Sequence, residues 1–221
     1  MVSMRMIAVG SVIAAGFVLG TALLLPTGSP SAPAAAHQDP PSMEEMMAAM
    51  EKAMTPGPEH AQLARAAGTW DLTMKIYMAG PDAERTSYKG TSVITSELGG
   101  RFILDRARWT MMMPNATGAM EEIEVEGIGI TGFDNTRQMY VGSWCDSMNT
   151  HLLTMAGSMP PGSNVLTMYG EMDEPMLNVF GRTVKYVITH IDDNHSTFAI
   201  YDLHAGDDYK VVEIEYTRAE R

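Results

Sequence analysis

The stretch Ala67-Gly68-Thr69-Trp70-Asp71-Leu72 is where the periodicity of the chain changes. Before it, apolar residues recur at helical spacing. From Trp70 to Met78, apolar and polar residues alternate, which is the pattern of a strand with one buried face. The chain keeps this period of two almost to its end, so we expect a helical segment to give way to a β-sheet at Gly68.

Downstream of this point, strand-like segments follow one another with only short turn signals between them. They are 70–78, 86–98, 101–111, 121–130, 138–146, 152–158, 165–172, 182–191, 196–203 and 209–218. Clusters such as Gly80-Pro81-Asp82 and Gly99-Gly100 mark the turns. No helix-length pattern lies between the segments, which excludes parallel β-α-β units. We therefore predict an all-β fold, an antiparallel barrel of about ten strands whose lumen can hold a small ligand.

One segment breaks the alternation. Ile123 and Val125 alternate with glutamates, but after Gly127 the apolar residues Ile128 and Ile130 fall on the opposite phase. A glycine at a change of phase is typical of a β-bulge or a tight bend. The pattern therefore predicts such an irregularity at Gly127.

The first 36 residues have the features of a leader. Arg5 precedes an uncharged apolar run from Met6 to Leu25, and the small residues Ala34-Ala35-Ala36 follow. This order predicts a secretory signal peptide cut after Ala36, and hence an exported protein, periplasmic or secreted. The apolar run is also long enough to span a bilayer, so an uncleaved N-terminal anchor is the alternative, and the only membrane contact we expect.

Two short helices are predicted between the leader and the barrel. Residues 37–57 form a linker that contains the first helix. A capping box, Ser42-Met43-Glu44-Glu45, marks the start of this helix. Methionines then fall on one helical face, which we expect to pack against another part of the protein, with Cu(I) binding as the alternative. They are Met43, Met46, Met47, Met50 and Met54. The second helix begins at Pro58, where the barrel domain, 58–221, also begins.

Charge and cysteine content exclude several classes of function. The net charge of −12 argues against nucleic acid or an anionic membrane surface as a partner. The single cysteine, Cys145, excludes an intramolecular disulfide and a thiolate-based zinc site. Its strand-like surroundings are typical of a small buried residue, so we expect Cys145 to be buried.

Gly68-x-Trp70 at the start of the first strand resembles the signature of the lipocalin and fatty-acid-binding superfamily. The resemblance implies that the tryptophan closes the barrel floor and that an arginine of the last strand packs over it. Arg218 lies in phase with the apolar residues Ile214 and Tyr216 and is the candidate. We therefore expect Trp70 to contact Arg218, and any ligand site to lie nearer the opposite mouth.

A wider resemblance covers about residues 58–218. It rests on Pro58-x-His60, Leu63, Gly68-Thr69-Trp70-Asp71, Leu98-Gly99-Gly100-Arg101-Phe102, Gly132-Phe133-Asp134-Asn135 and Tyr140-Val141-Gly142-x-Trp144-x-Asp146-Ser147-Met148. The chain is similar to a bacterial family named only as a domain of unknown function, number fifteen seventy-nine. This resemblance implies a lipocalin-like barrel and no particular activity, because a fold does not supply a function.

Five residues are candidates for contacts with a ligand in the lumen: Tyr140, Trp144, Asp146, Arg101 and His190. The first three share one face of a strand and combine aromatic rings with a carboxylate. Arg101 is a candidate anion contact, or the partner of Asp71, Asp105 or Asp146 in a structural ion pair.

Each of these candidates also has a structural interpretation. Trp144 would be a core residue and Asp146 the cap of the following turn. His190, in phase with Tyr186 and Ile188, would be a hydrogen-bonded core residue, although an inward histidine could also ligate haem iron. We predict no metal and no cofactor.

We expect an exported, non-enzymatic barrel that binds a small apolar or amphipathic molecule in a lumen lined by Trp70, Tyr140 and Trp144. No phosphate loop, dinucleotide fingerprint or Gly-x-Ser-x-Gly motif occurs in a fitting context, and no catalytic residue is assigned. Two alternatives remain. One is an enzyme acting on a small molecule in the same cavity, with Asp146 and His190 or Arg101 as its polar groups. The other is a structural module whose barrel is filled.

Overall fold

The computed structural model describes residues 40–77, 85–174 and 178–220. The predicted leader with its cut after Ala36, the end of the first strand at Met78 and the turn Gly80-Pro81-Asp82 lie outside these residues. None of the helices in the described part of the chain is long and apolar enough to cross a bilayer.

The helical segment before the barrel has two pieces, α1 (Met43–Met54) and α2 (Pro58–Ala64). The predicted capping box is present at the start of α1: the amide of Glu45 donates to Ser42 Oγ at 3.2 Å, and the amide of Ser42 donates to Glu45 Oε2 at 2.7 Å. The expected packing of the methionine face is wrong. All five methionines are 46–69 % exposed.

The end of α1 is held against the barrel by two side chains that donate to its last carbonyl groups. Arg101 Nη2 donates to the carbonyl oxygen of Met54 at 2.7 Å, and Asn135 Nδ2 donates to that of Thr55 at 2.7 Å. The last carbonyls of a helix have no partner within the helix, so these bonds fix the position of its end. α2 in turn contacts strands β3 and β4.

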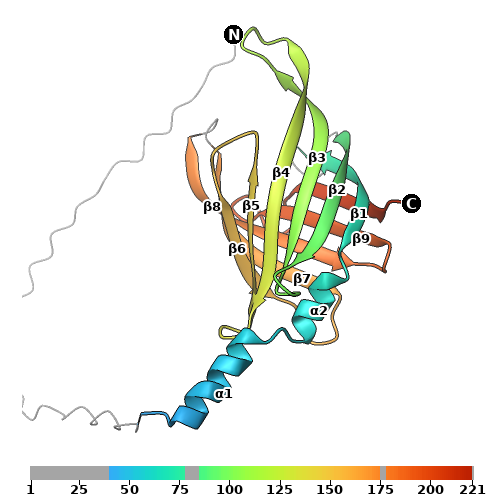
Figure 1. The fold of residues 1–221 in the computed structure, drawn as a ribbon. Coiled ribbons are helices and arrows are strands. Elements are labelled where there is room, and N and C mark those ends of the chain that lie inside the picture. The colour runs from blue at the N-terminus through green and yellow to red at the C-terminus, as the bar shows by residue number, and fades with distance from the viewer. Residues whose placement is uncertain (1–39, 78–84, 175–177, 221) are drawn as a thin grey trace, which may run out of the picture. The chain divides into compact units, whose positions relative to one another are not determined.

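All the strands expected after Gly68 are present. They are β1 (Gly68–Ile76), β2 (Thr86–Glu97), β3 (Phe102–Pro114), β4 (Met120–Asp134), β5 (Met139–Asp146), β6 (Leu153–Ser158), β7 (Val165–Glu174), β8 (Val179–His190), β9 (His195–Asp202) and β10 (Lys210–Arg218). Each pairs antiparallel with the next, and β1 pairs with both β2 and β10 to form a closed barrel (Figure 1). The predicted barrel is thus confirmed for the described residues.

The irregularity predicted at Gly127 is wrong. β4 pairs with β3 without a shift of register from Met120 to Gly132. Ile128 and Ile130 face outward, 38 % and 45 % exposed, and Gly127 and Gly129 take the inward positions. The reason lies on β5: a Cβ on Gly127 would meet Cζ2 of Trp144 at 2.1 Å, so the indole occupies the space of the missing side chain.

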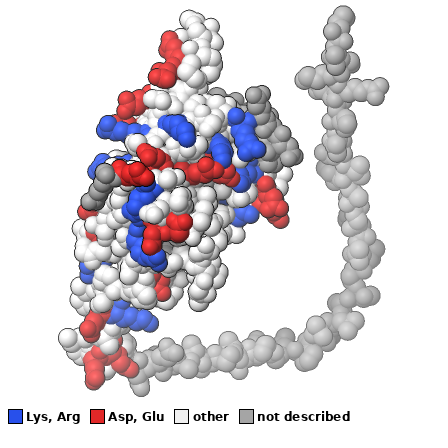
Figure 2. All heavy atoms as spheres, turned by 90° about the vertical axis from the view of Figure 1, so that its right-hand side faces the viewer, with Lys and Arg blue, Asp and Glu red and all other residues white. Residues whose placement is uncertain are grey.

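The outer surface differs between faces. On the face shown in Figure 2, basic and acidic side chains are interspersed. On the outer side of β1 and β10, Lys75 pairs with Glu213 and Glu215. On β2 to β5, one outward row carries apolar Val93 and Ile128 on either side of the exposed Arg106. Cys145 continues this row and is exposed, so its expected burial is wrong: the inward positions of β5 belong to Trp144 and its neighbours in phase.

Candidate functional site

The contact predicted between the first and last strands lies where β1 pairs with β10 and closes the sheet into a barrel. Trp70 and Arg218 are opposite each other across β1 and β10, and the guanidinium carbon of Arg218 lies 4.2 Å from the centroid of the indole. Arg218 also donates to the carbonyl oxygens of Ala67 and Arg65 at 2.9 and 3.1 Å. The expected contact is therefore present.

Gly68 is required for this arrangement. Its φ of +149° lies where only glycine is comfortable, and a Cβ there would meet Nη1 of Arg218 at 2.2 Å. Gly68 thus leaves space for Arg218, which covers the ring of Trp70.

The interior of the barrel contains a cavity of about 620 Å³. Its wall is mostly apolar and aromatic, with Trp109 and Trp144 stacked at 6.4 Å on one side and Tyr186 and Phe198 stacked at 6.0 Å on another. Pockets for small ligands typically have volumes of about 300–1,000 Å³ and this kind of lining. The cavity argues against a solidly filled barrel.

The cavity reaches the surface at the end of the barrel where α2 lies. Its exposed lining residues are all found there: Arg65 after α2, Asn164 between β6 and β7, and Ile191, Asp192 and Asp193 between β8 and β9. Trp70 belongs to the same end and lines the same cavity. The cavity thus opens at the end where Trp70 lies, whereas the sequence predicted a ligand site nearer the opposite mouth. Its lining also extends to Trp144 and Asp146 at the end of β5.

Three of the five candidate residues line this cavity, and Trp144 contributes its ring. Asp146 is less available, because its Oδ2 accepts from Trp144 Nε1 at 3.1 Å and its Oδ1 from the amide of Met148 at 3.0 Å. It orients the indole and caps the turn after β5. Its structural interpretation therefore describes what this carboxylate does.

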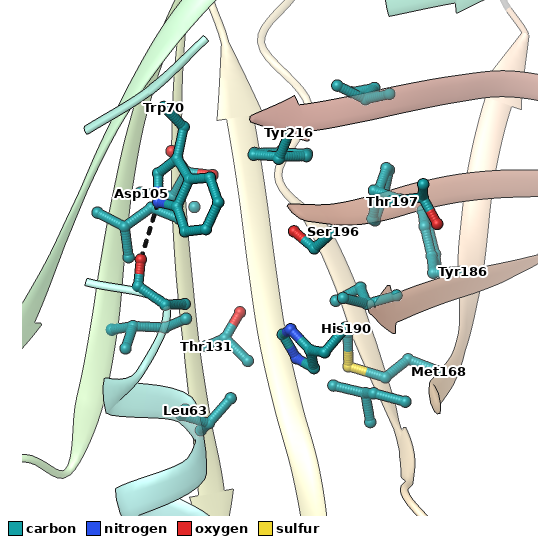
Figure 3. Close-up of a pocket in the computed structure, with 18 of the residues that line it drawn as sticks. Leu63, Trp70, Asp105, Thr131, Met168, Tyr186, His190, Ser196, Thr197 and Tyr216 are labelled. Atoms are coloured by element: carbon teal, nitrogen blue, oxygen red, sulfur yellow. Dashed lines mark hydrogen bonds between the residues drawn. The ribbon is translucent and has the colours of Figure 1, made fainter. Parts of the chain in front are cut away.

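His190 points from β8 into the cavity, toward Thr131 of β4 and Ser196 of β9 (Figure 3). Burial, and the nearby charge of Arg65, lower the pKa of its imidazole, so the ring is neutral at neutral pH. Within the described part of the chain, no hydrogen bond joins this ring to a carboxylate or a hydroxyl. His190 can therefore give one donor and one acceptor to a ligand.

The other two candidates do not line the cavity. Tyr140 is buried, 3 % exposed, in a cluster of core residues where its ring packs edge-on against Phe133 at 5.0 Å. Arg101 is exposed on the turn between β2 and β3 and donates to the carbonyl oxygens of Met54 and Leu98. Its expected ion pair with Asp71, Asp105 or Asp146 is not formed. The left-handed turn at Leu98–Gly100 directs it toward α1 instead.

Asp105, which the sequence suggested only as a partner for Arg101, is an acidic residue of the cavity wall. It faces inward from β3 in phase with the buried Ala107 and Trp109, and Ser92 Oγ donates to its Oδ1 at 2.5 Å. Burial raises the pKa of this carboxyl group. The pKa of the nearby Tyr216 hydroxyl is raised by its own burial and, to a smaller extent, by the charge of Asp105.

Two further polar atoms of the cavity wall have no hydrogen-bond partner among the described residues. They are Nε1 of Trp109 and the hydroxyl of Tyr186, and both side chains are more than nine-tenths buried. Burial raises the pKa of Tyr186 to about 12. Buried polar groups are nearly always paired, so these two atoms are free to bond a water molecule or a ligand in the cavity.

Replacing Asp105 with asparagine is expected to stabilise the ligand-free protein at neutral pH. The folded pKa of Asp105 lies above its ordinary value of 3.8, so the folded state holds a proton that the unfolded state releases. Its contribution to stability is therefore complete below pH 3.8 and is lost as the pH rises through the folded pKa. Urea titrations should show a higher free energy of unfolding for Asp105→Asn at pH 7 and no difference near pH 3.5. Equal stability at pH 7 would contradict the burial of a charge here.

Within the described residues, no cluster of three or more histidine, cysteine or acidic side chains could hold a metal ion. His190 and Asp146 line one cavity but share no hydrogen bond, and Arg101 lies outside it. The arrangement suits the retention of a molecule with an apolar body and a polar end.

Comparison with known proteins gives a family and a fold. The model of a family described as "Protein of unknown function (DUF1579)" matches residues 55–218. No curated protein matches the chain. Among solved structures, a redesigned beta barrel is 14 % identical, with 75 % of this chain and 100 % of that chain covered and a TM-score of 0.36. The S-type phycobiliprotein lyase of Guillardia theta is 11 % identical, with coverages of 82 % and 99 % and a TM-score of 0.45.

Proposed function

The chain belongs to the family described as Protein of unknown function (DUF1579), whose name states no activity, and from the cavity itself we propose that the protein binds a small apolar or amphipathic molecule inside its barrel. The observation that carries this proposal is an interior space of about 620 Å³ walled by aromatic side chains. The predicted leader adds the proposal that binding takes place outside the cytoplasm.

The shape and lining of the cavity support this function over a filled barrel. An apolar ligand gains roughly 25 cal/mol for each Å² of its surface that leaves water, and the stacked pairs Trp109–Trp144 and Tyr186–Phe198 offer flat surfaces for it. The unpaired Nε1 of Trp109 and hydroxyl of Tyr186 can bond a polar group of the ligand or a water molecule bound with it.

The polar end of the ligand is expected near the mouth. Asp105 precedes Trp109 along the inward row of β3 and therefore lies nearer the end where α2 contacts the barrel. His190, the last residue of β8, lines the cavity at the same end. A ligand would thus enter with its apolar part first and leave its polar part close to these two side chains.

The experiment is a titration with N-phenyl-1-naphthylamine, a neutral probe whose fluorescence rises in apolar surroundings. The wild type is compared with Thr131→Trp, which fills the cavity opposite His190 (Figure 3), and with Ile130→Trp as the matched control. Ile130 is the adjacent residue of β4 and faces outward, 45 % exposed.

We expect the probe to bind the wild type and Ile130→Trp alike, and Thr131→Trp at least about tenfold more weakly, the change that a loss of 1.4 kcal/mol produces. Circular dichroism before the titration verifies that all three proteins are folded. No binding to the wild type, or equal binding to all three, would contradict the proposed function.

A further inference from the structure

The charged groups of the cavity are not evenly distributed between its rim and its interior. At the rim, Arg65 and Arg218 are balanced by Asp192 and Asp193. Both arginines are already engaged: Arg65 pairs with Asp193 at 2.5 Å, and Arg218 donates to backbone carbonyls and lies on the Trp70 ring. Both arginines therefore carry their charge at the rim, where Asp192 and Asp193 offset it, and not in the interior.

The interior, in contrast, carries carboxylates and no lysine or arginine among its described lining residues. His190 is neutral. Asp146 has its oxygens occupied by Trp144 and the turn after β5, which leaves Asp105 as the charged group that can still accept. Of its two oxygens, Oδ1 accepts from Ser92, and no described side chain donates to Oδ2.

The surroundings of Asp105 suit a cation. The rings of Trp70 and Tyr216 stand edge to face at 6.3 Å and line the cavity together with Asp105 (Figure 3). No described residue forms a hydrogen bond with the Tyr216 hydroxyl. One face of Trp70 is taken by Arg218, and the ring of Tyr216 offers a second aromatic surface. A cation near an aromatic face and a carboxylate gains from both.

From this distribution of charge we propose that the ligand carries a basic amine at its polar end and that Asp105 binds this amine. The cavity then discriminates against carboxylate-headed molecules such as fatty acids. This inference rests on the proposed function. A carboxylate placed at the same point would be buried beside a like charge with no free cation to pair with it. Specificity then comes from the repulsion of the wrong head group as much as from the attraction of the right one.

The high pKa that burial gives Asp105 fits this role. Without a partner the carboxylate is costly to keep charged, and an ammonium group removes that cost by pairing with it. Asp105→Asn should therefore make the empty protein more stable and the complex weaker. A purely structural role for Asp105 would not give these opposite effects.

The test is displacement of N-phenyl-1-naphthylamine by decylamine, decanoate and 1-decanol, which share an alkyl chain and differ in head group. The wild type is compared with Asp105→Asn, which keeps the shape of the side chain and can still accept from Ser92. Asp71→Asn is the matched control, since Asp71 adjoins Trp70 on β1 and faces outward.

We expect decylamine to displace the probe from the wild type at the lowest concentration and decanoate at the highest. Asp105→Asn should lower the affinity for decylamine by about 10–100-fold, the range for a hydrogen bond to a charged group, and leave that for decanol unchanged. Asp71→Asn should behave as the wild type. Equal displacement by decanoate and decylamine, or an unchanged decylamine affinity in Asp105→Asn, would overturn this inference alone, whereas failure of the probe itself to bind would overturn the proposed function.

Discussion

Replacing Trp70 with alanine is expected to lower the free energy of unfolding by about 3–5 kcal/mol, the range for deletion of a large buried aromatic side chain. Trp70 is 3 % exposed and its Nε1 donates to the carbonyl oxygen of Ala66 at 2.9 Å. The change leaves that carbonyl without its donor and the Arg218 guanidinium without the ring beneath it. Small domains are stable by roughly 5–15 kcal/mol, so the loss is a large share of the total.

Urea denaturation followed by circular dichroism measures this effect, with Thr69→Ala as the control. Thr69 is the adjacent residue of β1 and faces outward, so its replacement should change the free energy of unfolding by less than about 0.5 kcal/mol. If Trp70→Ala cost no more than Thr69→Ala, the barrel would not depend on its first and last strands closing at this pair.

Replacing Gly127 with alanine is expected to cost about 1–3 kcal/mol, because the added methyl group overlaps the indole of Trp144. The new Cβ would lie 2.1 Å from Cζ2 of that ring. The indole must move, and it then loses its stacking on Trp109 and its hydrogen bond to Asp146. Binding of N-phenyl-1-naphthylamine should weaken as well, because the ring moves toward the cavity.

Gly142→Ala is the matched control for this change. Gly142 also faces the interior, on β5, but the nearest atom to its added Cβ would be Cγ of Met155 at 3.2 Å, part of a flexible side chain that can shift. We expect its cost in urea denaturation to be small. Equal costs for the two glycines would show that Trp144 does not depend on the space left by Gly127.

Much of this fold could be predicted from the sequence, because the signals that define it are local. The period of two after Gly68 and the turn residues between segments place the strands, since they depend only on neighbouring residues. The phase of β4 could not be predicted this way. Ile128 and Ile130 resemble inward residues, and only the register with β5 shows that Trp144 already fills the inward side.

The site was predictable in part for the same reason. Trp144, Asp146 and His190 line the cavity because alternation along β5 and β8 directs them inward. Tyr140 also faces inward, but it lies where α2 and the neighbouring strands fill the barrel, which is a non-local property. The place of Asp105 in the cavity was not predicted although its signal was present: it is an acidic residue in phase with Ala107 and Trp109.

Several residues on which the family resemblance rests have structural roles at the end of the barrel where α2 lies. His60 accepts the amide of Gly57 at 3.0 Å, Asn135 and Arg101 hold the end of α1, and a Cβ on Gly132 would meet Phe102 at 2.5 Å. These residues hold the helical segment against the barrel and shape the turns of the barrel at this end. A pattern of this kind identifies the fold and leaves the ligand to be read from the cavity.

The most direct test of the account is a crystal structure of the protein with bound N-phenyl-1-naphthylamine. We predict that the probe lies inside the barrel, with its naphthyl ring against Trp109 and Trp144 and its amine directed toward Asp105. A probe bound on the outer surface at Val93 and Ile128, with the interior side chains collapsed into the space between the strands, would contradict binding inside the barrel.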